Sequence, residues 1–204
     1  AEEIREIEDE TDNYEDMIGT YLIKLSARQL GTHDSAQAAQ YLKVIGDFER
    51  ISDHAVNLIE SAEELREKNI RLTDAAAEEL NSLTAAVREI LNLSLTAFLE
   101  DDLKAAGSVE PLEQIIDVLR VRMKEGHIDR MQTGMCTQQT GFVYSDLITN
   151  CQRISDHCSN LAVSLIRAEV DKMDAHAYLG SLKAGEDREF VELYNQYKKK
   201  YNLD

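Results

Sequence analysis

Apolar residues recur along this chain in alternating steps of three and four positions, the spacing that gathers them on one face of an α-helix. The first ladder is a narrow stripe of the kind found at the seam of a helical bundle, and it comprises Ile4, Ile7, Thr11, Tyr14, Ile18, Tyr21 and Leu25. A glycine and a polar run at residues 31–35 follow it, so the pattern predicts that the first helix stops there.

Five further ladders follow, so the pattern predicts six helices and an all-α fold. The second runs to about Lys68 and carries two adjoining apolar stripes, which indicates packing against two neighbours. Thr73 or Asp74 can cap the third helix, which breaks near residues 100–102. Pro111 falls inside the fourth, where we expect a kink within one helix.

The chain contains an internal repeat. Residues 48–58 return as residues 151–161 with Arg-Ile-Ser-Asp-His and then Asn-Leu at the same positions. The spacing of Glu8 and Asp12, about forty residues before the first block, recurs in Glu113 and Asp117 before the second. The sequence therefore predicts two tandem three-helix bundles related by a repeat, at residues 1–103 and 104–204.

Charge narrows the range of partners. The 204 residues include 22 Lys and Arg against 39 Asp and Glu, which gives a net charge of −17. Such a chain is repelled by nucleic acids and by anionic lipid, whereas cations are natural partners. There is no apolar run of about eighteen residues, so we expect no direct membrane insertion by these residues.

Three further observations bear on the cellular compartment, the extent of the chain and enzymatic activity. Cys151 and Cys158 are two turns apart on one predicted helix, roughly 10 Å, which is too far for a disulfide and favours a reducing compartment. The chain begins without Met inside a helical pattern, so we expect a piece of a longer protein. Enzyme motifs such as a phosphate loop or a nucleophile elbow do not occur, and we predict no enzymatic activity.

Carboxylates spaced four residues apart suggest a cation site. Glu49 and Asp53 share one helical face, as do Glu8 and Asp12, and antiparallel packing of the two helices would bring both pairs to one seam. Partly buried carboxylates repel one another unless they are protonated or bridged by a cation. Oxygen ligands suit Mg²⁺, Mn²⁺, Ca²⁺ or iron.

The second half offers a weaker version of the same site. Its acids are Glu113, Asp117 and Asp156, and Gln152 stands where the first half has Glu49. A neutral amide oxygen in place of a carboxylate lowers the affinity for a cation. His54 and His157 follow the aspartates directly, which turns them about 100° away on an undistorted helix, so a structural hydrogen-bonded role is favoured over ligation.

Structural interpretations stand beside these functional ones. For Glu8 and Asp12 alone a solvated acidic face is the simpler interpretation, whereas duplication favours ligation by Glu49 and Asp53. The remaining polar residues of the two blocks have expected structural roles: the arginines pair with the acids, and the asparagines hydrogen-bond across the bundle. These are Arg50, Arg153, Asn57 and Asn160.

The doubled Glu-Arg-Ile-x-Asp-His-x-x-Asn pattern, preceded by Glu-x-x-x-Asp pairs, resembles the PhoU family over nearly the whole chain. Residues 18–25, 45–57 and 109–113 look more narrowly like the PhoU-like C-terminal domain of bacterial sodium/phosphate cotransporters. Other residues fit the same subgroup, namely His127, Ile128, Arg130, Cys136 and the run Ser145-Asp146-Leu147.

The resemblance implies two helical bundles with metal sites built from the Glu/Asp-x-x-x-Asp motifs, holding divalent or trivalent ions such as iron, zinc, magnesium or manganese. Carried over by motif, the implied ligands are Glu8, Asp12, Glu49, Asp53, Glu113, Asp117 and Asp156. It also implies a regulatory domain on the cytoplasmic face of the membrane, whose partner is the transmembrane carrier portion of the same polypeptide; a homodimer is compatible with it. Alternatives are a free-standing PhoU-type negative regulator and a metal-free structural module.

Overall fold

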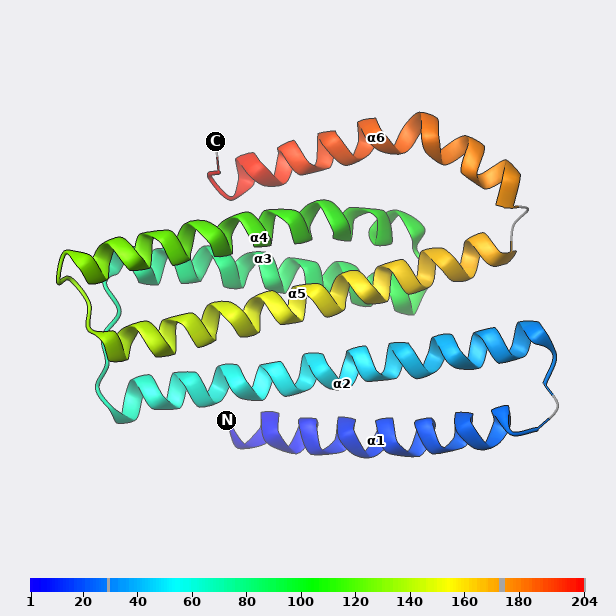
Figure 1. The fold of residues 1–204 in the computed structure, drawn as a ribbon, viewed down its shortest axis with the longest axis horizontal. Helices are drawn as coiled ribbons and strands as arrows, with labels where there is room; N and C mark the ends of the chain where they lie inside the picture. Colours follow the sequence, from blue (N-terminus) through cyan, green and yellow to red (C-terminus); the bar gives the residue numbers. More distant parts are fainter. Residues whose placement is uncertain (29, 173–174, 204) are drawn as a thin grey trace.

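The computed structural model describes the backbone of residues 1–28, 30–172 and 175–203, and the side chains of residues 1–28, 30–168 and 188–203. In these ranges the chain is helical without any strand (Figure 1). The helices are α1 (Glu2–Ser26), α2 (Thr32–Glu67), α3 (Asp74–Glu100), α4 (Leu103–Gln132), α5 (Gln138–Lys172) and α6 (Ala175–Lys200). The predicted all-α class is confirmed.

Local chemistry sets the helix ends near the predicted positions. Thr73 caps α3, because its hydroxyl accepts a hydrogen bond from the Ala76 N–H at 3.2 Å. Asp101 ends α3 with a φ of 52°, in the left-handed region, and the Asp102 carboxylate then caps α4. Pro111 lies inside α4, which continues through it as one helix.

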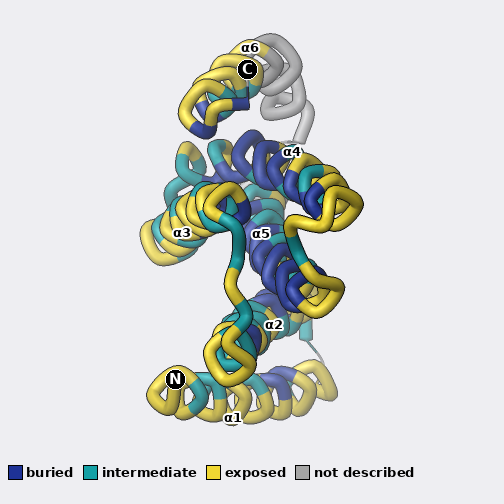
Figure 2. The backbone as a smooth tube through the Cα atoms, turned by 90° about the vertical axis from the view of Figure 1, so that its left-hand side faces the viewer, coloured by how far each residue is buried: buried dark blue, intermediate teal, exposed yellow. Residues whose placement is uncertain are grey.

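Helix α5 occupies the centre of the fold, where it packs against α2, α3 and α4 (Figures 1 and 2). The core forms where α3, α4 and α5 meet, and its fully buried side chains include Leu83, Ile90, Leu112, Ile116 and Ile148. Helix α6 lies mainly against α4, and α1 packs only along α2 in the described part of the chain. The helices are therefore stacked outward from α5 rather than placed evenly around it.

The partners of α3 differ from the expected grouping of α1, α2 and α3 in one bundle. Its apolar face, with Leu83, Val87 and Ile90, enters the core shared with α4 and α5. One side-chain contact of α3 with α2 is an edge-to-face pair of Phe98 and Phe48, with ring centroids 5.2 Å apart. The predicted boundary at residue 103 falls in the short α3–α4 connection, and a division into two units there stays a prediction.

The apolar stripe of α1 is also placed differently from the expected seam. Gly19 and Leu22 are buried, whereas Ile7, Tyr14 and Tyr21 are 54%, 60% and 64% exposed. The reason is geometric: among the described residues α1 meets only α2, and α3, which would have covered the stripe, packs against α4 and α5 instead.

Candidate functional site

The first acidic cluster lies between α1 and α2. Glu49 and Asp53 of α2 are half-buried, as is Glu8 of α1, whereas Asp12 is exposed. Burial raises the pKa of Glu8, and a hydrogen bond to Asp53 and the charge of Asp53 add to that effect. Burial also raises the pKa of Glu49, followed by the charge of Asp53, while Arg50 partly offsets the increase. The two helices thus bring together the acids that the spacing predicted.

The second cluster lies between α4 and α5. Burial raises the pKa of Glu113 to about 7, and the charges of Asp117, Glu110 and Asp156 contribute. The pKa of Asp156 is raised as well, first by burial. The carboxylates at the α4–α5 seam therefore repel one another as well.

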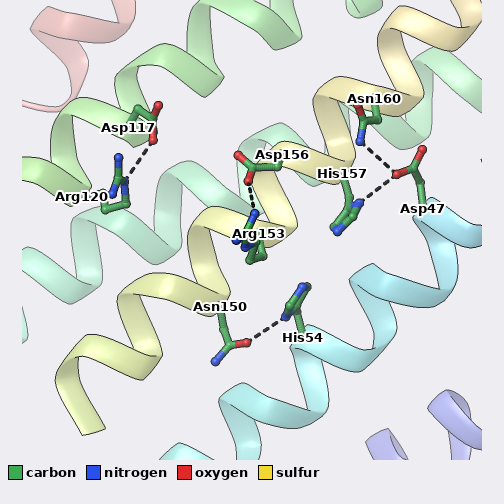
Figure 3. Close-up of polar contacts among 9 residues, drawn as sticks. All are labelled: Asp47, His54, Asp117, Arg120, Asn150, Arg153, Asp156, His157 and Asn160. Carbon is green, nitrogen blue, oxygen red and sulfur yellow. Dashed lines mark hydrogen bonds and ion pairs between the residues drawn. The ribbon is translucent and has the colours of Figure 1, made fainter. Parts of the chain in front are cut away.

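Two arginines moderate the charge of the second cluster. Arg120 Nε donates to Asp117 Oδ1 at 3.1 Å, and Arg153 lies 3.5 Å from Asp156 Oδ2 (Figure 3). The predicted pairing of Arg153 with an acid of its own block is confirmed. Gln152 is half-buried one turn before Asp156, so this cluster has fewer negative and more positive groups than the first.

The donor chemistry of both clusters suits hard cations, since every candidate ligand is a carboxylate. In the described part of the chain, however, no group of three or more His, Cys, Asp or Glu side chains is arranged to hold a metal ion. Metal ligation by the seven acids therefore stays a prediction.

A second polar arrangement crosses the α2–α5 interface. Asp47, only 5% exposed, accepts hydrogen bonds through Oδ1 from His157 Nδ1 at 2.8 Å and from Asn160 Nδ2 at 3.1 Å (Figure 3). His54 Nδ1 lies 2.9 Å from Asn150 Oδ1, and the two imidazoles stack with centroids 5.8 Å apart. The carboxylate can only accept, so His157 Nδ1 carries the proton. The favoured structural role of both histidines is confirmed.

The two histidine contacts involve equivalent positions of the internal repeat. Asp47 and Asn150 each stand seven residues before the histidine of their own block, but each pairs with the histidine of the other block. Exchange of α2 and α5 therefore relates the two pairs by a local pseudo-twofold axis. The sequence did not identify Asp47 and Asn150, although their equal distance from the histidines was a usable signal.

Residues 1–62 and 80–165 match the PhoU domain. The chain belongs to the PhoU domain family. The matched ranges contain both acidic clusters and both histidine pairs of this PhoU domain.

A curated relative of this PhoU domain is the Phosphate-specific transport system accessory protein PhoU homolog 1 of Thermotoga maritima. The two are 24% identical over 146 residues, which cover 72% of this chain. The aligned part spans 62% of that relative, less than two thirds of its length.

His127 and Arg130, which the resemblance also singled out, lie at the end of α4 and contact the start of α5. Arg130 forms a bidentate ion pair with Glu79 at 2.9 and 2.7 Å, and Tyr144 donates to the same carboxylate. His127 is buried against Gly141, where a Cβ would lie 2.6 Å from Nε2. These contacts fasten α3, α4 and α5 together and are separate from the acidic clusters.

None of the described helices combines the length and the apolar character needed to cross a membrane.

Proposed function

We propose that this PhoU domain regulates phosphate uptake as the cytoplasmic domain of a sodium-dependent phosphate transporter, and that it responds to metal cations bound at its α1–α2 and α4–α5 seams. The observation that carries the proposal is the meeting of acids from two helices at each seam, with raised pKa values at Glu8, Glu49, Glu113 and Asp156. Ionised carboxylates in this arrangement repel one another, and that repulsion favours a bound cation.

Cation binding at the first seam would change how α1 and α2 are held together. Glu8 and Asp53 belong to different helices, so any change in their repulsion acts on the spacing of α1 and α2. A bound cation would supply the positive charge that neutralises this cluster. At the second seam Arg120 and Arg153 already supply positive charge, so we expect weaker cation binding there.

A metal measurement tests the first part of the proposal. Protein purified without chelators is analysed for bound metal beside Glu49→Gln and, as a matched control, Glu60→Gln, an exposed carboxylate about three turns further along the same helix. We expect Glu49→Gln to lower the metal-to-protein ratio and Glu60→Gln to leave it unchanged. Equal ratios in all three proteins would remove the metal from the proposal.

An uptake measurement tests the second part. In the full-length carrier, Asp53→Ala combined with Asp156→Ala is expected to change how phosphate uptake responds to phosphate supply. Unaltered uptake and unaltered regulation would refute a regulatory role for the acidic seams.

A second candidate is a free-standing regulator that acts through soluble signalling proteins. The name of the Thermotoga maritima relative, an accessory protein of a phosphate-specific transport system, favours it. The coding sequence upstream of residue 1 separates the two candidates: a hydrophobic region there supports the transporter domain, and a start codon directly before Ala1 supports the free-standing regulator.

A further inference from the structure

We propose that the exposed apolar stripe of α1 is the docking surface for a cationic amphipathic helix of a partner protein. We define the stripe as Ile4, Ile7, Tyr14, Ile18 and Tyr21. The proposal does not depend on metal binding.

The internal repeat provides a counterpart of this stripe on α4, and that counterpart is buried against other helices. Glu8 and Glu113 are equivalent positions 105 residues apart. Each residue of the α1 stripe therefore has a counterpart 105 residues later, on α4. Ile7 is 54% exposed and its counterpart Leu112 is fully buried. Tyr14 and Ile18 are 60% and 40% exposed, whereas their counterparts on α4, Leu119 and Met123, are 6% and 1% exposed. One pattern is therefore buried in the second half and open in the first.

The difference in exposure between the two stripes arises from the helices that pack against them. The counterpart stripe on α4 lies in the core that α3 and α5 complete, while α1 meets only α2 within the described residues. Figure 2 shows most of α1 as exposed at the edge of the molecule. The stripe from Ile4 to Tyr21 is about 25 Å long, which corresponds to about five turns of a covering helix.

Charge identifies the kind of helix that fits. Glu3, Glu6 and Glu10 are exposed and border the stripe on one side. Their counterparts on α4, 105 residues later, are Ser108, Pro111 and Ile115. The acidic border is thus specific to the open stripe, and it complements lysine or arginine on an incoming helix.

The same charge disfavours a second copy of this chain. Nine of the first sixteen residues are acidic, so two α1 helices placed face to face would bring like charges together. Like charges opposed across an interface weaken association, whereas complementary charges speed and direct it.

The test uses two labelled peptides of about 18 residues, five helical turns. Both have leucine along one helical stripe; one has lysine beside it and the other has glutamate. Binding to the purified chain is followed by fluorescence anisotropy. We expect the lysine peptide to bind, with an affinity that falls as salt rises, and the glutamate peptide not to bind.

Matched variants locate the site. Tyr14→Asp combined with Ile18→Asp should weaken lysine-peptide binding by at least about tenfold, although it adds negative charge. Ile23 is 62% exposed and lies on the same helix, about 140° from Ile18, so Ile23→Asp is the control and should leave binding unchanged. Circular dichroism checks that each variant keeps its helices, as expected for exposed positions.

Three results would overturn the proposal. The first is equal binding of both peptides, and the second is binding that Tyr14→Asp with Ile18→Asp leaves unchanged. The third is a dimer of the chain, seen by light scattering, that Ile18→Asp dissociates, because the stripe would then belong to a second copy.

Discussion

The raised pKa of Glu113 makes the stability of this PhoU domain dependent on pH. An ordinary glutamate has a pKa of 4.5, and burial between α4 and α5 raises that of Glu113 to about 7. Between these values the folded chain binds more protons than the unfolded chain, so the free energy of unfolding falls as the pH rises. Below about pH 4.5 the carboxyl is protonated in both states and the effect vanishes.

The magnitude follows from this difference. A pKa difference of one corresponds to about 1.4 kcal/mol, so the full difference between 4.5 and about 7 would amount to roughly 3.5 kcal/mol. Glu113 is half-buried, and solvent screening reduces this to about 1–2 kcal/mol. We therefore expect Glu113→Gln to raise the free energy of unfolding by about 1–2 kcal/mol at pH 8 and to change it little at pH 4.

Urea unfolding followed by circular dichroism, with a chelator present, measures this difference. Glu125→Gln is the matched control, since Glu125 is an exposed carboxylate on the same helix, and it should change stability by less than about 0.5 kcal/mol at either pH. A gain for Glu113→Gln that is equal at both pH values, or no gain at pH 8, would refute the reasoning.

Four further predictions concern single positions and use the same unfolding assay. Asp47→Ala should lower the free energy of unfolding by about 2–4 kcal/mol, because two donors of α5 lose their buried acceptor. Thr73→Ala should lower it by about 1 kcal/mol through loss of the helix cap. Gly141→Ala should lower it by about 1–3 kcal/mol, since a Cβ there would lie 2.6 Å from His127 Nε2. Gly107→Ala, with open space around the added carbon, should raise it by about 0.5–1 kcal/mol.

Each of these has an outcome that contradicts it. Asp47→Ala without loss would mean that water replaces the carboxylate, and Asp47→Asn, which copies the Asn150 pair, should cost less than Asp47→Ala. An unaltered Thr73→Ala would show that water replaces the cap. If Gly141→Ala and Gly107→Ala behaved alike, the close packing of His127 could not be the cause.

The sequence was sufficient to predict the helices but not their pairing. Ladders such as that of α1 show which face of a helix is apolar, and caps such as Thr73 show where a helix begins. Neither feature identifies the neighbour. Helix α3 carries a stripe that would suit a bundle with α1 and α2, yet Leu83 and Ile90 lie in the core with α4 and α5. Which helices pack together depends on how well their whole surfaces complement one another, and the apolar pattern of a single helix does not contain that information.

The candidate site was predicted in part for a similar reason. Carboxylates at helical spacing, such as Glu49 and Asp53, predict their own side of the helix, and the structure brings Glu8 of α1 to that side. Asp47 and Asn150 could not be predicted from the identities that the two blocks share, because these equivalent positions differ in charge and lie directly before residues 48–58 and 151–161. Equivalent positions of the repeat that differ in residue type can therefore mark paired contacts as well as identical positions do.

The pseudo-twofold relation of the histidine pairs has an evolutionary consequence. An ancestral half-length protein that paired with itself would have needed one amino acid to serve both pairs, since each copy would present the same surface. Fusion of two gene copies releases that constraint, and the present chain uses it, with Asp47 opposite one imidazole and Asn150 opposite the other. Selection can now adjust each half independently, so the same substitution made at paralogous positions will have two different phenotypes.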